Sequence, residues 1–134
     1  MKKLRKKSPL KNSTKKLLRK AQNLCEREMK LAVHRRDKKC QICGSIQRLQ
    51  CDHWLSRRNK STYYDLANLT LLCSKCHYLK SYGYQDMTQR VEDEVLLREG
   101  EQVCQEIRMR ARTIKKWEIQ ELNDLAETYS RLFL

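Results

Sequence analysis

The chain has 134 residues, and its 30 Lys/Arg against 16 Asp/Glu give a formal net charge of +14. This length allows one small domain with extensions or two small units, and no apolar run approaches the length of a membrane span. The basic N-terminus has no continuous apolar region and does not resemble a secretory signal. The seven cysteines therefore favour metal binding in a reducing compartment, and we expect a cytoplasmic location.

Positive charge is concentrated at the N-terminus. Residues 1–39 carry sixteen Lys/Arg against three acids, residues 40–85 carry six against two, and residues 86–134 carry eight against eleven. Such a density favours a polyanionic partner, with nucleic acid first among the candidates. The alternative interpretation is a solvated tail that aids solubility.

The first element that the pattern predicts is a basic amphipathic helix. Residues 1–12 show no apolar periodicity and predict disorder in the free protein. Ser13 or Thr14 could cap a helix that runs to about Arg36. Lys and Arg fill one face, and the other carries apolar residues at near-helical spacing, namely Leu17, Leu18, Ala21, Leu24, Cys25 and Ala32. This helix could lie on a phosphate backbone, cover a neighbouring module with its apolar stripe, or do both.

The centre of the chain predicts two short strands and a helix. Residues 48–54 are typical of a strand, and residues 56–64 are polar and basic, as in a loop. Residues 69–72 form a short apolar strand. A helix should follow over residues 74–82 and end at Gly83, because glycine accepts the left-handed conformation of a helix C-terminus.

The last third of the chain predicts more helices. Residues 86–98 fit one helix with a break at Gly100, and the helical spacing then continues to Ile114. The final segment has the clearest apolar stripe, formed by Ile119, Leu122, Leu125, Ala126, Tyr129, Leu132 and Phe133. This stripe could pack within the chain or form a homodimer contact through the C-terminal helices.

Two Cys-x-x-Cys pairs flank the predicted strands, and these are Cys40 with Cys43 and Cys73 with Cys76. Four thiolates in two such pairs are typical of a closed structural zinc site. Gly44 would permit the tight turn after the first pair. The alternative is four buried, reduced cysteines. The three other cysteines, Cys25, Cys51 and Cys104, are interpreted as packing residues.

Four polar residues between and beside these pairs could form a metal-dependent phosphodiesterase site: Asp52, His53, Asn68 and His77. Neutral imidazole suits His53 to remove a proton from water, while Asp52 could bind a catalytic divalent ion. Because successive strand residues point to opposite sides, Asp52 and His53 can share a site only if the strand ends or twists there. Each residue also has an ordinary structural explanation when taken singly.

Further basic residues lie close to these four in the sequence. Arg57, Arg58 and Lys60, with Tyr63, fall between the two strands and could grip phosphates beside the cut, or they could form a solvated loop. Lys75 and Lys80 on the predicted helix would flank the same groove and add nucleic-acid contacts.

The ordered set of the four cysteines, Asp52-His53, Asn68, His77 and Lys80 resembles the HNH endonuclease motif over about a third of the chain. The resemblance implies a ββα-metal fold with structural zinc and one catalytic divalent ion, Mg²⁺ or Mn²⁺. It also implies that His53 is the general base, that Asp52 and His77 bind the catalytic ion, and that Asn68 orients the base. Cleavage would leave 5′-phosphate and 3′-hydroxyl ends.

A narrower resemblance is to the phage recombination nucleases called NinG or Rap. It rests on residues 51–57 and 64–68 and on residues 113–129, and it implies branched DNA as the substrate, in the cytoplasm of the host cell. Two features depart from these families: residues 57–60 replace a glycine pair that many HNH proteins carry, and His77 stands where NinG proteins often have Asn.

The sequence therefore predicts a mainly helical α+β protein. A basic arm and helix (residues 1–38) would precede a zinc-stabilised HNH module (39–85), and a helical region (86–134) would follow it. The predicted function is a metal-dependent DNA endonuclease. The alternative is a non-catalytic zinc module that binds nucleic acid through its basic tail.

Overall fold

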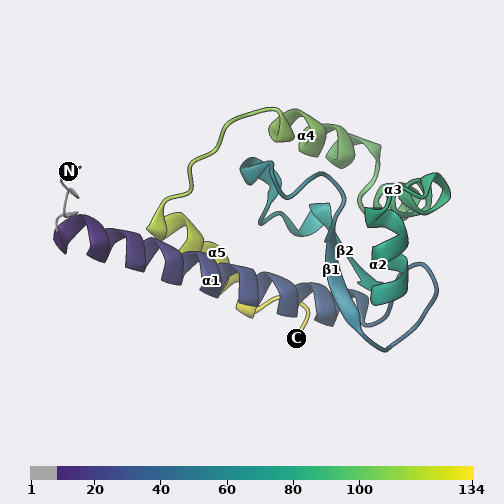
Figure 1. Cartoon of the computed structure of the whole chain (residues 1–134), viewed down its shortest axis with the longest axis horizontal. Coiled ribbons are helices and arrows are strands. Elements are labelled where there is room, and N and C mark those ends of the chain that lie inside the picture. Colours follow the sequence, from purple (N-terminus) through teal and green to yellow (C-terminus); the bar gives the residue numbers. More distant parts are fainter. Residues whose placement is uncertain (1–8) are drawn as a thin grey trace, which may run out of the picture.

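The computed structural model describes residues 9–134. Of the disorder predicted for residues 1–12, the part over residues 1–8 lies outside that range, and the part over residues 9–12 is wrong, because those residues are helical. The longest element is α1 (Pro9–Asp37), which forms one edge of the molecule and lies alongside α5 (Ile119–Ser130) (Figure 1). The helix begins before the predicted cap at Ser13 or Thr14. Proline is tolerated in a first helical turn, where its missing N–H has no partner to lose, so residues 9–12 extend the helix.

The apolar stripe of α1 forms the larger core. Cys25, Met29 and Val33 are completely buried at spacings of four residues, which places them on one face of the helix. They pack with Leu122 and Tyr129 of α5 in a single cluster. The C-terminal stripe is thus used for packing within the chain, the first of its two predicted roles. At the end of that stripe, Phe133 is exposed.

The predicted strands are present as an antiparallel hairpin of β1 (Leu49–His53) and β2 (Leu69–Cys73). Every residue of β2 is buried. Leu69 and Leu71 join the cluster with α1 and α5, while Leu72 joins a second cluster around the cysteines. Because neighbouring strand residues face opposite ways, α1 covers the face of the hairpin that is opposite the cysteines.

The chain passes from β2 directly into α2 (Ser74–Ser81), with Cys73 as its N-cap. Gly83 adopts a φ of 74° after this helix, as predicted. The two short 3₁₀ turns between the strands are η1 (Lys60–Thr62) and η2 (Leu66–Asn68). The succession β1–β2–α2 is the ββα arrangement that the sequence predicts, and it lies within a mainly helical chain (Figure 1).

Two further helices follow, α3 (Gln85–Glu99) and α4 (Glu101–Ala111), separated at Gly100 as predicted. The expected continuation of α4 to Ile114 is wrong, because the helix ends at Ala111 and Ile114 is fully exposed. The hydroxyl of Thr113 donates to the carbonyl oxygen of Arg110 at 2.7 Å and so satisfies one of the last carbonyls. Residues 112–118 then form the linker to α5. Within residues 9–134, no helix combines the length and apolarity needed to cross a bilayer.

Candidate active site and zinc site

The four cysteines of the two predicted pairs converge. Their sulfur atoms all lie within 4.8 Å of one another, and the Sγ atoms of Cys43 and Cys73 are 3.5 Å apart. Tetrahedral zinc with bonds of about 2.3 Å to sulfur needs sulfurs roughly 3.8 Å apart. The donor set and its spacing therefore fit a structural zinc ion.

Backbone amides support these sulfurs. The amide of Cys43 points at Cys40 Sγ and that of Cys76 points at Cys73 Sγ, each at 3.5 Å. Burial alone would raise the pKa of the Cys40 thiol, but backbone hydrogen bonds outweigh it and lower that pKa to about 6. Gly44, directly after the Cys40–Cys43 pair, has a φ of 78°. Glycine adopts this conformation without a Cβ penalty.

The remaining cysteines do not join this cluster. Cys25 is fully buried in the α1 cluster, Cys104 is fully buried on α4, and Cys51 is half-buried against the α1 cluster. Burial raises the pKa of Cys25 to about 12 and that of Cys51 to about 11. These thiols stay protonated at neutral pH, which suits packing residues and not metal ligands.

A second constellation lies around Asp52 and His53, at the end of β1. Both residues line one pocket of about 350 Å³, together with His77 and Lys80 from α2. Because β1 ends at His53, the alternation of strand side chains does not separate the two residues. The pocket also contains Arg57 from the loop and Glu26 from α1.

Asp52 is buried, and its carboxylate lies beside the side chains of Lys80 and His77. The Lys80 ammonium lies 3.0 Å from its Oδ1, and His77 Nε2 lies 3.6 Å from the same oxygen. Oδ2 lies 2.8 Å from the ammonium but outside hydrogen-bonding geometry, so among the described residues it has no hydrogen bond. Burial raises the pKa of Asp52, and the charge of Lys80 opposes that shift.

His53 is held by the loop between the strands. Its Nε2 lies 3.0 Å from the carbonyl oxygen of Tyr63, and the two rings pack with centroids 4.7 Å apart. Burial lowers the pKa of His53 below its ordinary value, although the bond to Tyr63 opposes this effect. The imidazole is therefore neutral at pH 7 and above.

Asn68 is completely buried and ties the loop to the start of β2. Its side-chain oxygen accepts from the Leu55 amide at 2.7 Å, and its side-chain nitrogen donates to the carbonyls of Leu55 (3.1 Å) and Thr62 (3.2 Å). Its backbone carbonyl accepts from the Trp54 amide at 2.8 Å. These bonds fix the two residues that directly follow His53.

The predicted basic contacts fall in different places. Arg57 lines the pocket of Asp52 and His53, while Arg58 and Lys60 line a neighbouring hollow beside the linker. Lys75 is exposed on α2. The ammonium of Lys80 is engaged within the protein, because it also donates to the carbonyl oxygen of His53 at 2.8 Å.

Sequence reasoning missed two supports of this site. Glu26 accepts a 2.8 Å hydrogen bond from the Tyr63 hydroxyl; as one of three acids in a strongly basic segment, it carried a signal. Arg36 donates to the carbonyls of Leu66 (2.8 Å) and Leu69 (2.5 Å), on either side of Asn68. Its charge could not be distinguished from the surrounding lysines and arginines.

Residues 40–83 match the family model described as HNH endonuclease. The match covers the first cysteine knuckle, the hairpin and α2, and it confirms the resemblance over a third of the chain. It indicates a nuclease or nucleic-acid-binding role for this HNH module. Searches of curated proteins and of solved structures gave no match, so the resemblance to NinG or Rap proteins stays a prediction.

Proposed function

We propose that the protein is a metal-dependent DNA endonuclease in which His53 is the general base. The observation that carries this proposal is the contact between His53 Nε2 and the Tyr63 carbonyl. A carbonyl can only accept, so Nε2 carries the ring hydrogen and Nδ1 keeps its lone pair. With the pKa of His53 lowered by burial, Nδ1 can take a proton from water at neutral pH.

In the proposed reaction, His53 Nδ1 accepts a proton from a water molecule, whose oxygen attacks the scissile phosphorus. The bond from phosphorus to the 3′ oxygen breaks, which leaves a 5′-phosphate and, after that oxygen gains a proton, a 3′-hydroxyl. Asn68 holds the backbone that follows His53 and so keeps the ring in place relative to the phosphate. We assign Asn68 as a positioning residue.

Asp52 and His77 are the proposed ligands of the catalytic ion. The Asp52 Oδ2 atom is buried without a hydrogen bond from a described residue, and carboxylate oxygen suits Mg²⁺ or Mn²⁺. His77 approaches the same carboxylate, and its role as the second ligand follows from the resemblance to the HNH motif. When bound, such an ion stabilises negative charge on the phosphate and the leaving oxygen. In this structure the Lys80 ammonium pairs with Asp52. It would have to move partly away from the carboxylate when the ion binds.

The basic side chains and the N-terminal charge provide for DNA binding. Arg57 beside the site, together with Arg58, Lys60 and Lys75, is proposed to contact phosphates. By resemblance to NinG and Rap proteins, we propose branched recombination intermediates of a phage as the substrate and the host cytoplasm as the location. A homodimer would suit such a substrate. Because the apolar face of α5 packs on α1, the dimer contact would have to use the remaining surface of the C-terminal helices.

A non-catalytic zinc module would need the four cysteines and the positive charge. It would not need Asp52, His53 and His77 around one pocket, nor a completely buried Asn68 behind them. This convergence favours the nuclease.

The test is a cleavage assay with the zinc-loaded full chain on linear, nicked, flap and four-way DNA, in Mg²⁺ or Mn²⁺ and without added divalent ion. The proposal expects metal-dependent cutting with 5′-phosphate ends and the fastest rate on branched DNA. If the protein binds all four substrates and cuts none in either metal, the binding-module interpretation is correct.

A further inference from the structure

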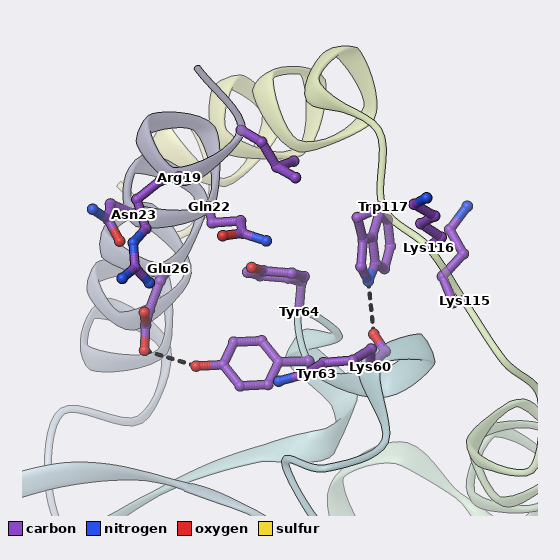
Figure 2. Close-up of a pocket in the computed structure, with 11 residues that line it drawn as sticks. Arg19, Gln22, Asn23, Glu26, Lys60, Tyr63, Tyr64, Lys115, Lys116 and Trp117 are labelled. Carbon is purple, nitrogen blue, oxygen red and sulfur yellow. Dashed lines mark hydrogen bonds between the residues drawn. The ribbon is translucent and has the colours of Figure 1, made fainter. Parts of the chain in front are cut away.

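A second hollow of about 350 Å³ lies directly beside the proposed active site, between α1, η1 and the linker before α5 (Figure 2). Two residues, Glu26 and Tyr63, line both pockets. The hydrogen bond between the Tyr63 hydroxyl and Glu26 therefore stands at the boundary between them. A DNA strand with its scissile phosphate in the first pocket would have a neighbouring nucleotide at the second.

Aromatic rings form the walls of this hollow. Tyr63 and Tyr64 meet edge to face at 4.7 Å, and Tyr64 and Trp117 meet edge to face at 5.5 Å. The Trp117 Nε1 atom donates to the Lys60 carbonyl at 2.7 Å, so the indole is held in place from η1. Tyr63 and Trp117 are half-exposed, while Tyr64 is buried behind them in the core. Accessible, rigid aromatic rings are the surfaces on which single-stranded bases stack.

Cationic side chains lie around the aromatic walls. Lys60 lies over the Tyr63 ring and Lys115 over the Trp117 ring, at 4.9 and 4.8 Å from the centroids. Arg19 and Lys116 also line the hollow, both exposed and neither paired with an acid among the described residues. Charge at these positions can neutralise a phosphate next to a bound base.

One polar side chain reaches into the hollow from α1. The amide of Gln22 extends toward the space between Tyr64 and Trp117 (Figure 2). It is half-buried, and no hydrogen bond joins it to another described residue. A carboxamide both donates and accepts, as the polar edge of a nucleobase requires.

We propose that this hollow binds one unpaired nucleotide of the DNA substrate. Its base would stack against Trp117 with its edge toward Gln22, and the phosphates on its two sides would lie near Arg19 and Lys116, which stand on opposite sides of the hollow (Figure 2). A base in an intact duplex is already stacked and paired, so it could enter only at the cost of unpairing. The inference rests on the proposed function and deepens it: the nuclease selects DNA with single-stranded nucleotides beside the cut.

The experiment measures binding without cleavage, so that it does not depend on the nuclease activity. Zinc-loaded full-length protein without added Mg²⁺ or Mn²⁺ is titrated with duplex DNA that carries a short unpaired segment. A matched substrate has abasic sites in that segment. Stacking of one base predicts that the abasic substrate binds about 5- to 150-fold more weakly.

Variants then locate the effect. Gln22→Ala, on the surface of a helix, should reduce the preference for the base-containing substrate about 2- to 12-fold, and Trp117→Ala should abolish it. Gln102→Ala on α4 and Trp54→Phe are the matched controls and should keep it. In the Trp54→Phe protein, whose one remaining indole is Trp117, the base-containing substrate should quench fluorescence more than the abasic one.

Equal affinity of the parent protein for both substrates would overturn the proposal, as would a preference that survives both Gln22→Ala and Trp117→Ala. If the protein prefers the base-containing substrate as expected but cuts no DNA under any metal condition, the nucleotide-binding pocket is supported and the proposed nuclease function is wrong.

Discussion

The Nε2 atom of His53 lies 3.0 Å from the carbonyl oxygen of Tyr63. This single contact selects one tautomer of the ring, because the carbonyl has no hydrogen to offer. It also ties the proposed base to the loop between the strands. The same residue, Tyr63, is bonded through its hydroxyl to α1, so the long helix helps to position the proposed site.

The tautomer can be measured. Above the pKa of His53, long-range ¹H–¹⁵N correlation spectra should show a neutral ring protonated at Nε2. The signals are assigned by their loss in His53→Ala, and exposed His34 serves as the internal reference. A neutral ring protonated at Nδ1 would contradict the assignment of Nδ1 as the proton acceptor.

Zinc removal should unfold the part of residues 40–85 that packs around the four cysteines. The cluster beside the cysteines contains few buried apolar side chains, chiefly Leu72, Met87 and Val91, too few to offset the entropy of ordering this segment. Zinc binding to small structural sites is worth about 10–16 kcal/mol. Elemental analysis should find one zinc per chain, and a strong chelator should change the circular dichroism. Absence of zinc, with a spectrum that chelation leaves unchanged, would refute the zinc site.

Asn68→Ala should destabilise the protein and slow cleavage together. It leaves backbone groups of Leu55 and Thr62 without partners in a buried setting, and each unsatisfied group costs about 1–3 kcal/mol. Urea unfolding should show a loss of about 2–4 kcal/mol. The matched control is Asn123→Ala on the exposed face of α5, which should be close to neutral. Equal stability of the two variants would show that Asn68 does not hold the loop.

The N-terminal charge should act on binding. Deletion of residues 1–12 removes six Lys/Arg, and the log–log salt dependence of DNA affinity should flatten by about 2–4 units. The cleavage rate at saturating DNA should stay within about tenfold, because these residues contribute no proposed catalytic group. A longer deletion through residue 38 would remove Met29 and Val33 from the core and unfold the protein. An unchanged salt slope would mean that this segment does not contact DNA.

Sequence spacing predicted the parts of the molecule that depend on local order. The four cysteines, the two strands and the helix after Cys73 follow from residues close together in the chain, and the structure places them as expected. The convergence of Asp52, His53 and His77 was predicted from their residue types and from resemblance to a known motif. Local spacing alone does not show it, because it needs the hairpin and α2 to meet.

What the sequence did not show depends on long-range packing. The roles of Glu26 and Arg36 arise because α1 lies across the hairpin. Glu26 is unusual as an acid in a basic segment, but its partner Tyr63 cannot be read from the sequence, and one more arginine in a basic helix carries no signal. The second hollow exists because the linker after α4 brings Trp117 back to η1. The sequence instead suggested that the helix continues through Ile114, since helical spacing can recur by chance in an exposed segment.

The most direct test of the central claim is the single-turnover cleavage rate of His53→Ala beside that of the parent protein, both zinc-loaded and at saturating DNA in the same metal. Loss of a general base should lower the rate by roughly 10²–10⁴, while DNA affinity stays nearly unchanged, because His53 is proposed to act on water. His34→Ala, an exposed histidine of α1 outside the pocket, should cut like the parent. Cleavage by His53→Ala at the parental rate would contradict the assignment of His53 as the general base.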